Sequence, residues 1–229
     1  MNDDERRTEW SDEFDYLYGM VKLLYTRTQM WEAIDSELVR TQQPGSGLIV
    51  EVFRPVVGES QGVLVRRLLD EDGQTRSIVR LLGQMAEHHE ALTRARFVDQ
   101  CQPQGRDEAN KAFDAIAGVG KDFVPRGYVL QMRERIVTAG EDLIESINQI
   151  VAHDQREKTA QPFTWGQLER AIEGLSAEFI EIGRLLRGGS YYEPIPYLAP
   201  GWNQPFKHGL FGPGAPTYGT VHFIERHGG

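Results

Sequence analysis

Apolar residues recur at three- and four-residue steps through most of the chain up to Arg187, with polar residues between them. This spacing gives each α-helix one apolar stripe and is typical of a helical bundle. It predicts helices over about 10–40, 48–70, 77–97, 107–117, 125–153 and 165–187. No alternating pattern long enough for a sheet precedes Gly189, so the predicted fold is all-α, with five or six helices in one bundle.

Proline, glycine and capping residues divide these helices. Pro55 and Gly58 lie inside the second helix and predict a kink or a break there. Turns are predicted where Gly, Pro and short polar residues cluster, at 44–47, 71–73, 102–105 and 118–120. Helix starts are predicted at Ser77 as an N-cap, at Pro125 as a first residue, and at Thr164 with Gln167 as a capping box.

The composition changes after Gly188, where six of the eleven prolines accompany many glycines and aromatic residues. No long helix is expected there, and the only strand candidate is the segment 220–224. The aromatic content is too high for a purely disordered tail, so we expect part of it to pack across the helices. The predicted organisation is a helical bundle at 1–187 and an irregular C-terminal tail at 188–229 packed on it.

The net charge of −9 disfavours a protein that binds nucleic acid over its whole surface, but it leaves room for a local basic groove. The single cysteine, Cys101, cannot form an internal disulfide, and this favours the cytoplasm. The acidic start does not resemble a signal peptide, and no apolar run approaches membrane-spanning length. We therefore expect no membrane association.

His153 and Asp154 close the long fifth segment of this helical pattern and are the first candidates for chemistry. A histidine can act as a general acid or base near neutral pH, and a helix C-terminus favours its protonated form. The alternative is structural, with His153 capping the helix and Asp154 beginning the loop.

Arg66 and Arg67, followed one turn later by Asp70, are the second candidate. Two adjacent guanidinium groups on a helix can bind a phosphate. The alternative is a salt-bridge network, since Arg66 and Asp70 have the i,i+4 spacing of a helical ion pair. Further arginines follow along the chain, at Arg76, Arg80, Arg94 and Arg96.

Two other patterns do not predict a site. His88 and His89 are adjacent, so they point in different directions on a helix, and no further His or Cys lies one turn away. We therefore expect no metal site. The segment from Gly118 to Lys121 lacks the first glycine and the final Ser or Thr of a phosphate-binding loop, and no strand precedes it.

Three stretches taken together carry a family resemblance: VLVRRLLDEDGQTRSIVRLL at 63–82, INQIVAHDQ at 147–155 and FTWGQLERAIEGL at 163–175. They resemble the AbiU-type abortive-infection branch of the HEPN superfamily, which comprises helical proteins of prokaryotic conflict systems. The resemblance implies a helical bundle, a homodimer, and a metal-independent RNase that needs no cofactor.

The resemblance also implies site residues. In such enzymes an arginine and a histidine are separated by four to six residues; the histidine transfers a proton and the arginine stabilises charge on the phosphorane. The histidine corresponds to His153, and the arginine would have to stand at Ser146, Ile147 or Asn148, none of which is basic. Asn148 can donate hydrogen bonds but carries no charge. Arg66 or Arg67 would then have to complete the site, held in place by Asp70. We expect one of these guanidinium groups within about two hydrogen-bond lengths of the His153 ring.

Two functions are therefore carried forward. The first is an HEPN-like protein of a phage-defence (antiviral) or toxin–antitoxin system, with RNA-binding and RNase activity centred on His153. The second is a catalytically silent helical module that binds a protein partner, such as an antitoxin, or a nucleotide. The absence of the motif arginine favours the second. Clustering of Arg66, Arg67, Arg80 and His153 in one cleft would favour the first.

Overall fold

The computed structural model describes residues 2–41, 46–153 and 163–188. These residues form seven α-helices and two short 3-10 helices, and they contain no strand beyond one isolated antiparallel bridge between Thr93 and Phe123. The predicted all-α fold is confirmed. The tail from 189 onward, with its strand candidate at 220–224 and its predicted packing, lies outside the described residues.

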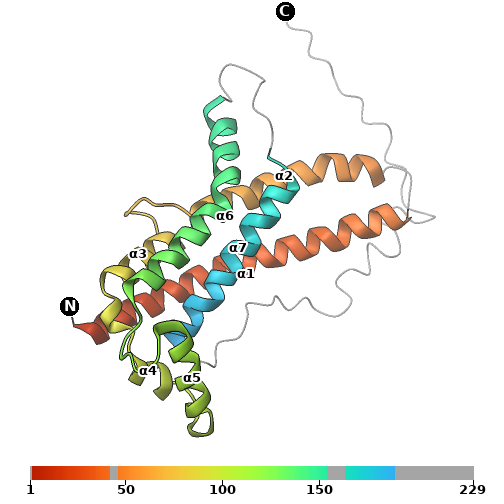
Figure 1. Cartoon of the computed structure of the whole chain (residues 1–229). Helices are drawn as coiled ribbons and strands as arrows, with labels where there is room; N and C mark the ends of the chain where they lie inside the picture. The colour runs from red at the N-terminus through yellow and green to blue at the C-terminus, as the bar shows by residue number, and fades with distance from the viewer. Residues whose placement is uncertain (1, 42–45, 154–162, 189–229) are drawn as a thin grey trace, which may run out of the picture.

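The helices form two crossing pairs with smaller helices at one end (Figure 1). The elements in chain order are α1 (Asp3–Thr41), α2 (Ser46–Leu68), α3 (Ile78–Glu87), α4 (Arg94–Asp99), α5 (Arg106–Ala117), α6 (Arg126–His153) and α7 (Trp165–Arg187). The first two run antiparallel and extend together beyond the other helices, while α6 and α7 pack on each other and cross them. The core lies where the pairs cross, and there Phe14 of α1 stacks on Phe179 of α7 with ring centroids 4.5 Å apart.

Two glycines allow α6 to approach its neighbours closely. A Cβ at Gly174 of α7 would collide with the Cβ of Ala139, and a Cβ at Gly140 would collide with the Leu69 side chain. Close backbone approach of this kind requires residues without side chains. The α6–α7 crossing is therefore fixed by the pair Gly174 and Ala139.

The first helix begins earlier than predicted. It starts at Asp3 rather than near Trp10. Asn2 and Glu5 satisfy each other's backbone groups: the Glu5 amide donates to Asn2 Oδ1 at 2.8 Å, and the Asn2 amide donates to Glu5 Oε2 at 2.9 Å. This reciprocal cap stabilises a first turn whose sequence is mostly charged.

A kink or a break was predicted in the second helix; the break is wrong, because α2 runs without interruption through Pro55 and Gly58. Pro55 is exposed, so water can satisfy the carbonyl that loses its helical donor. Gly58 is buried because aromatic rings pack on it: Trp165 and Phe163 atoms lie 3.6 and 3.7 Å from where its Cβ would be. The exposure of Pro55 and the aromatic packing on Gly58 therefore explain how a continuous helix accommodates both residues.

The third predicted helix, 77–97, is divided in two. Ser77 caps α3 as predicted, accepting from the Arg80 amide at 3.1 Å, but the helix ends at Glu87. The segment that follows is tied to the loop before α6, with the Val124 amide donating to the Leu92 carbonyl at 3.0 Å and the Arg94 amide to the Asp122 carbonyl at 2.7 Å. Because these hydrogen bonds tie the segment to a distant loop, α3 ends before it and α4 begins as a separate helix. The described residues consequently hold seven helices rather than five or six.

The later helices agree with the predictions to within a residue. The α5 helix begins at Arg106, and α6 begins at Arg126, next to Pro125. Thr164 and Gln167 form the predicted capping box of α7, which spans Trp165–Arg187. Across the described helices, no segment combines the length and the apolar character that a bilayer crossing demands.

Candidate functional site

An open groove of about 1350 Å³ lies between the end of α2, the turn at 70–76, the first half of α1 and the second half of α6. Its lining combines apolar side chains with charged and amide ones. The residues lining it are Tyr16, Val63, Arg66, Arg67, Leu69, Asp70, Glu71, Gln74, Thr75, Arg76, Val137, Glu141, Ile144, Glu145, Asn148 and Gln149. The groove therefore brings together Arg66, Arg67, Asp70 and Asn148, which the sequence predicted from two distant motifs.

The turn at 70–76 is held by its own short polar side chains. The Asp72 amide donates to Asp70 Oδ1 at 3.0 Å, and the Ser77 hydroxyl donates to the Asp70 carbonyl at 2.5 Å. The first of these is an Asx-type bond, which fixes a turn after a helix end. Together the two hydrogen bonds hold in place the turn that forms one wall of the groove and that contains Arg76.

The predicted ion pair between Arg66 and Asp70 is absent. The helix ends at Leu68, so Asp70 lies beyond it and the i,i+4 geometry does not apply. Asp70 accepts from a backbone amide of its own turn instead. No salt bridge of Asp70 with an arginine is found among the described residues, and its role of holding a guanidinium group stays a prediction.

Three groove arginines form no salt bridge among the described residues, namely Arg66, Arg67 and Arg76, although the charge of Arg76 still acts on Glu13. Two of them gather on one phenol ring, because Arg67 donates to the Tyr16 hydroxyl at 2.7 Å and the Arg76 guanidinium lies 5.1 Å from the centre of the Tyr16 ring. Stacking on an aromatic face leaves the donors of Arg76 open. All three side chains are exposed and available to an anion.

The other arginines of the predicted basic series are structural. Arg94 forms an ion pair with Asp114 at 2.5 Å and lies over the Phe113 ring, and Arg96 pairs with Asp4. The salt-bridge interpretation thus holds for these two.

Arg80 is the third structural arginine and does not line the groove. It lies 3.7 Å from the buried carboxylate of Glu13. Burial raises the pKa of Glu13, and the positive charges of Arg80 and Arg76 only partly oppose that rise. One oxygen of Glu13 is buried without a hydrogen-bond partner. Arg80 therefore belongs to the α1–α3 contact rather than to the site.

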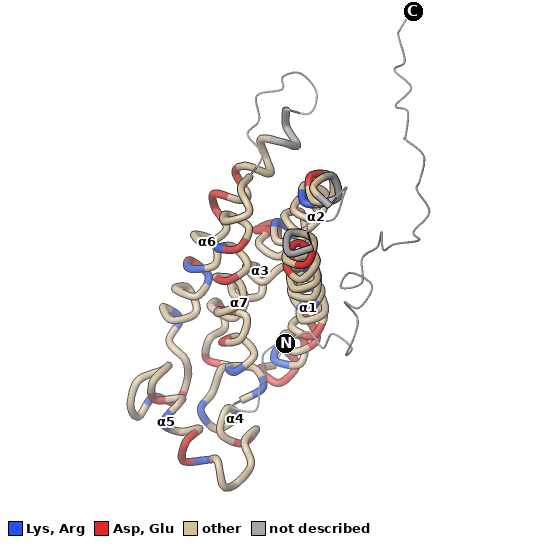
Figure 2. The backbone as a smooth tube through the Cα atoms, turned by 90° about the vertical axis from the view of Figure 1, so that its right-hand side faces the viewer, with Lys and Arg blue, Asp and Glu red and all other residues tan. Residues whose placement is uncertain are grey.

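The wall formed by α6 carries acidic and amide groups. Its arginines lie in the first half of the helix and most of its carboxylates in the second (Figure 2). Glu141, Glu145 and Gln149 follow one another at four-residue steps along the groove, and Gln149 donates to Glu145 at 3.3 Å. His153 is the next position of this row and the last residue of α6. Its side chain, and all of Asp154, lie outside what the structure describes, so the predicted contact between His153 and Arg66 or Arg67 remains a prediction.

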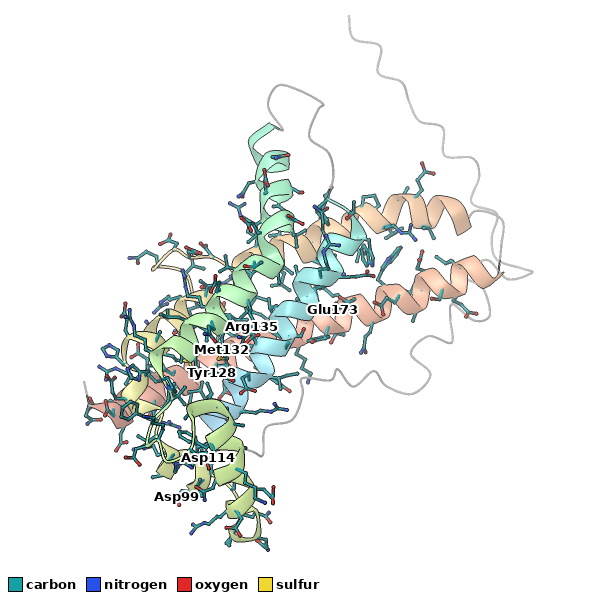
Figure 3. All side chains as sticks on the ribbon, in the orientation of Figure 1. Asp99, Asp114, Tyr128, Met132, Arg135 and Glu173 are labelled. Carbon is teal, nitrogen blue, oxygen red and sulfur yellow. The ribbon has the colours of Figure 1, made fainter. Side chains whose placement is uncertain are left out.

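A second polar cluster, on the face shared by α6 and α7, was not predicted. Arg135 donates twice to Glu178, at 2.5 and 2.8 Å, and the Tyr128 hydroxyl donates to Glu181 at 2.9 Å. Figure 3 shows Tyr128, Met132 and Arg135 one turn after another along α6. Burial, followed by the charge of Glu181, raises the pKa of the Tyr128 phenol. These groups are satisfied by one another, so the cluster fixes the helix pair rather than forming a reactive site.

Of the two adjacent histidines, His89 has a structural role. His89 Nδ1 lies 2.9 Å from the Val124 carbonyl, and its other ring nitrogen lies 3.3 Å from Glu90. Within the described residues no three His, Cys, Asp or Glu side chains are grouped as metal ligands.

The groove can bind an anion through guanidinium groups and present an amide beside it. Tyr16 and Arg76, which contact each other in the groove, were not among the predicted site residues. Tyr16 contacts Arg67 of α2 across a sequence separation of 51 residues, so no local sequence pattern predicts that Tyr16 lines the groove. No protein-family model, curated protein or solved structure matches the chain.

Proposed function

We propose that the chain is an HEPN-like protein of a prokaryotic phage-defence or toxin–antitoxin system, acting in the cytoplasm as a metal-independent RNase. The groove is its RNA-binding site. What supports the proposal is one observation: Arg66, Arg67 and Asn148, which come from two separate motifs of the resemblance, line the same groove. His153 follows Gln149, which lines the groove, by four residues in α6.

The proposed chemistry follows from these groups. The 2′-hydroxyl of a ribose attacks the adjacent phosphorus, and the 5′-oxygen of the next nucleotide leaves, giving a 2′,3′-cyclic phosphate and a free 5′-hydroxyl. His153 transfers the proton between these oxygens. Arg66 or Arg67 neutralises the charge that develops on the phosphorane, and Asn148 donates a hydrogen bond to it. No metal ion enters this scheme.

Cleavage of a labelled single-stranded RNA by the purified full-length chain, with EDTA present, tests the proposal. We expect cyclic-phosphate ends, a loss of about 10²–10⁴-fold in rate for His153→Ala, and a marked loss for Arg66→Ala. The matched control is Arg106→Ala, an exposed arginine on α5 whose removal changes net charge equally. Cleavage that survives His153→Ala would contradict the mechanism.

A second function is favoured by a specific observation, the composition of the groove. It contains no motif arginine on α6, and four carboxylates line it, at Asp70, Glu71, Glu141 and Glu145. Carboxylates repel a polyanion but suit a protein partner or the base and sugar of a nucleotide. RNA or nucleotide that binds without being cleaved, with loss of binding in Arg66→Ala, would favour this catalytically silent binding module.

We also propose that the chain is a homodimer and that an antitoxin or another defence protein binds it. Light scattering at micromolar concentration measures the mass directly. A mass corresponding to one chain would contradict the dimer without bearing on the groove.

A further inference from the structure

Arg76 lies at the end of the groove formed by the turn at 70–76, with its guanidinium group over the Tyr16 ring. The guanidinium carbon is 5.1 Å from the ring centre. Tyr16 also accepts a hydrogen bond from Arg67 at 2.7 Å, so one phenol positions two guanidinium groups. Arg76 contacts Tyr16 on one side and is otherwise exposed in the groove. A planar guanidinium group held in this way is a surface on which an unpaired nucleobase stacks.

Glu141 is an exposed carboxylate on the α6 wall of the same groove. Within the described part of the chain it forms no hydrogen bond or ion pair, so both of its oxygens are available as acceptors. The other three carboxylates of the groove are engaged within the protein: Glu71 by Arg133, Glu145 by Gln149, and Asp70 by the Asp72 amide.

The turn that carries Arg76 starts next to Glu141. Leu69, directly before the turn, packs against Gly140, and its side chain occupies the position that a Cβ at Gly140 would take. Arg66 precedes Leu69 by three residues, which is about 4.5 Å along the axis of α2. A nucleotide whose phosphate binds Arg66 can therefore place its base at the level of Glu141.

We propose that this end of the groove binds an unpaired guanine. The base stacks on Arg76, and its N1–H and N2–H groups donate to the Glu141 carboxylate. Guanine is the only one of the four RNA bases with two adjacent donors on its Watson–Crick edge, and a carboxylate offers two acceptor oxygens side by side. Adenine, cytosine and uracil each present an acceptor beside their donor, which a carboxylate repels.

This assignment gives a role to a carboxylate in a groove that otherwise attracts phosphates. It deepens the proposed RNase function by naming the nucleotide that the groove selects. It rests on that function only for the source of the guanine, which is an RNA strand rather than a free nucleotide.

Binding of short RNA to the full-length chain, in a His153→Ala background, tests the proposal without cleavage. The probes are labelled single-stranded uridine oligomers that carry one central guanosine, adenosine or inosine, and fluorescence anisotropy measures each affinity. We expect the guanosine probe to bind roughly 5–150-fold more tightly than the adenosine probe, as a two-bond contact to a base does. Inosine lacks the N2 amine, so its probe should bind with intermediate affinity.

Glu141→Gln should remove most of this preference without weakening adenosine binding. The matched control is Glu134→Gln, an exposed carboxylate of the same helix outside the groove, which removes the same charge and should keep the preference. Arg76→Lys keeps the charge but not the planar group, so it should weaken both probes alike. Circular dichroism checks that each variant is folded. A guanosine preference that survives Glu141→Gln would overturn the proposal.

Titration of GMP and AMP into the same protein by calorimetry separates this inference from the proposed function. A preference for GMP that depends on Glu141, without RNA binding, would support the guanine site and contradict the RNase. RNA binding with equal affinity for the guanosine and adenosine probes would overturn the guanine site and leave the proposed function standing. Binding of neither RNA nor GMP would overturn both.

Discussion

Glu13 lies in an environment that suits a carboxylate poorly. It is 6% exposed, one of its oxygens has no hydrogen-bond partner, and Arg80 approaches it only to 3.7 Å. Burial raises its pKa, Arg80 and Arg76 lower it in part, and the nearby charge of Glu9 raises it further. An ionised Glu13 therefore destabilises the folded chain near neutral pH.

This predicts a pH-dependent effect of Glu13→Gln. Because the folded pKa lies above the unfolded value, the contribution of Glu13 to stability is fully present below the unfolded pKa and is lost as pH rises through the folded pKa. The variant lacks this loss, so its free energy of unfolding relative to the native chain should increase across that window and level off above it. Urea denaturation at a series of pH values measures the difference. A difference that stays constant through the window would contradict the account.

The pairing of single residues also depends on contacts that a local sequence pattern cannot predict. Arg66 and Asp70 have the spacing of an ion pair, but the helix stops at Leu68 and Asp70 caps a turn instead. Conversely, Arg76 belongs to the groove only because Tyr16, far away in sequence, lies beneath it. The candidate residues were predictable from their types. Which arginines remain unpaired depends on contacts between distant helices.

The helices themselves were largely predictable, because apolar spacing and capping residues act locally. Thr164 and Gln167 defined the start of α7, and Pro125 marked the start of α6. The errors occur where distant segments intervene. The bridge of Thr93 with Phe123 divides the third predicted helix, and the rings of Phe163 and Trp165 account for Gly58 within an unbroken α2.

The α6–α7 crossing yields an element-scale prediction. In Gly174→Ala the new methyl group collides with Ala139, so we expect a loss of about 1–3 kcal/mol of unfolding free energy. Gly83→Ala, in the middle of α3, meets no atom within 4 Å and is the matched control, with an expected gain of roughly 0.5–1 kcal/mol. Thermal or urea unfolding measures both. Equal effects of the two substitutions would contradict close packing at Gly174.

At the scale of the whole molecule, the groove exists because two distant parts of the chain meet. The end of α2 and the turn after it supply three arginines that form no salt bridge among the described residues. The second half of α6 supplies Asn148 and leads to His153. In a chain of net charge −9, this cluster is a local exception. Any polyanion attracted to the chain should therefore depend on it more than on the surface as a whole.

The salt dependence of RNA binding tests this central claim most directly. Affinity for a single-stranded RNA is measured by fluorescence anisotropy over a range of salt concentrations, in a His153→Ala background to prevent cleavage. Each phosphate contact contributes about 0.7 to the slope of log affinity against log salt concentration.

If Arg66 and Arg67 each contact a phosphate, Arg66→Gln with Arg67→Gln should reduce the slope by about 1.4. The control pair, Arg106→Gln with Lys111→Gln on α5, removes the same charge far from the groove and should leave the slope unchanged. Equal slopes for the two double variants would contradict the groove as the site of RNA binding.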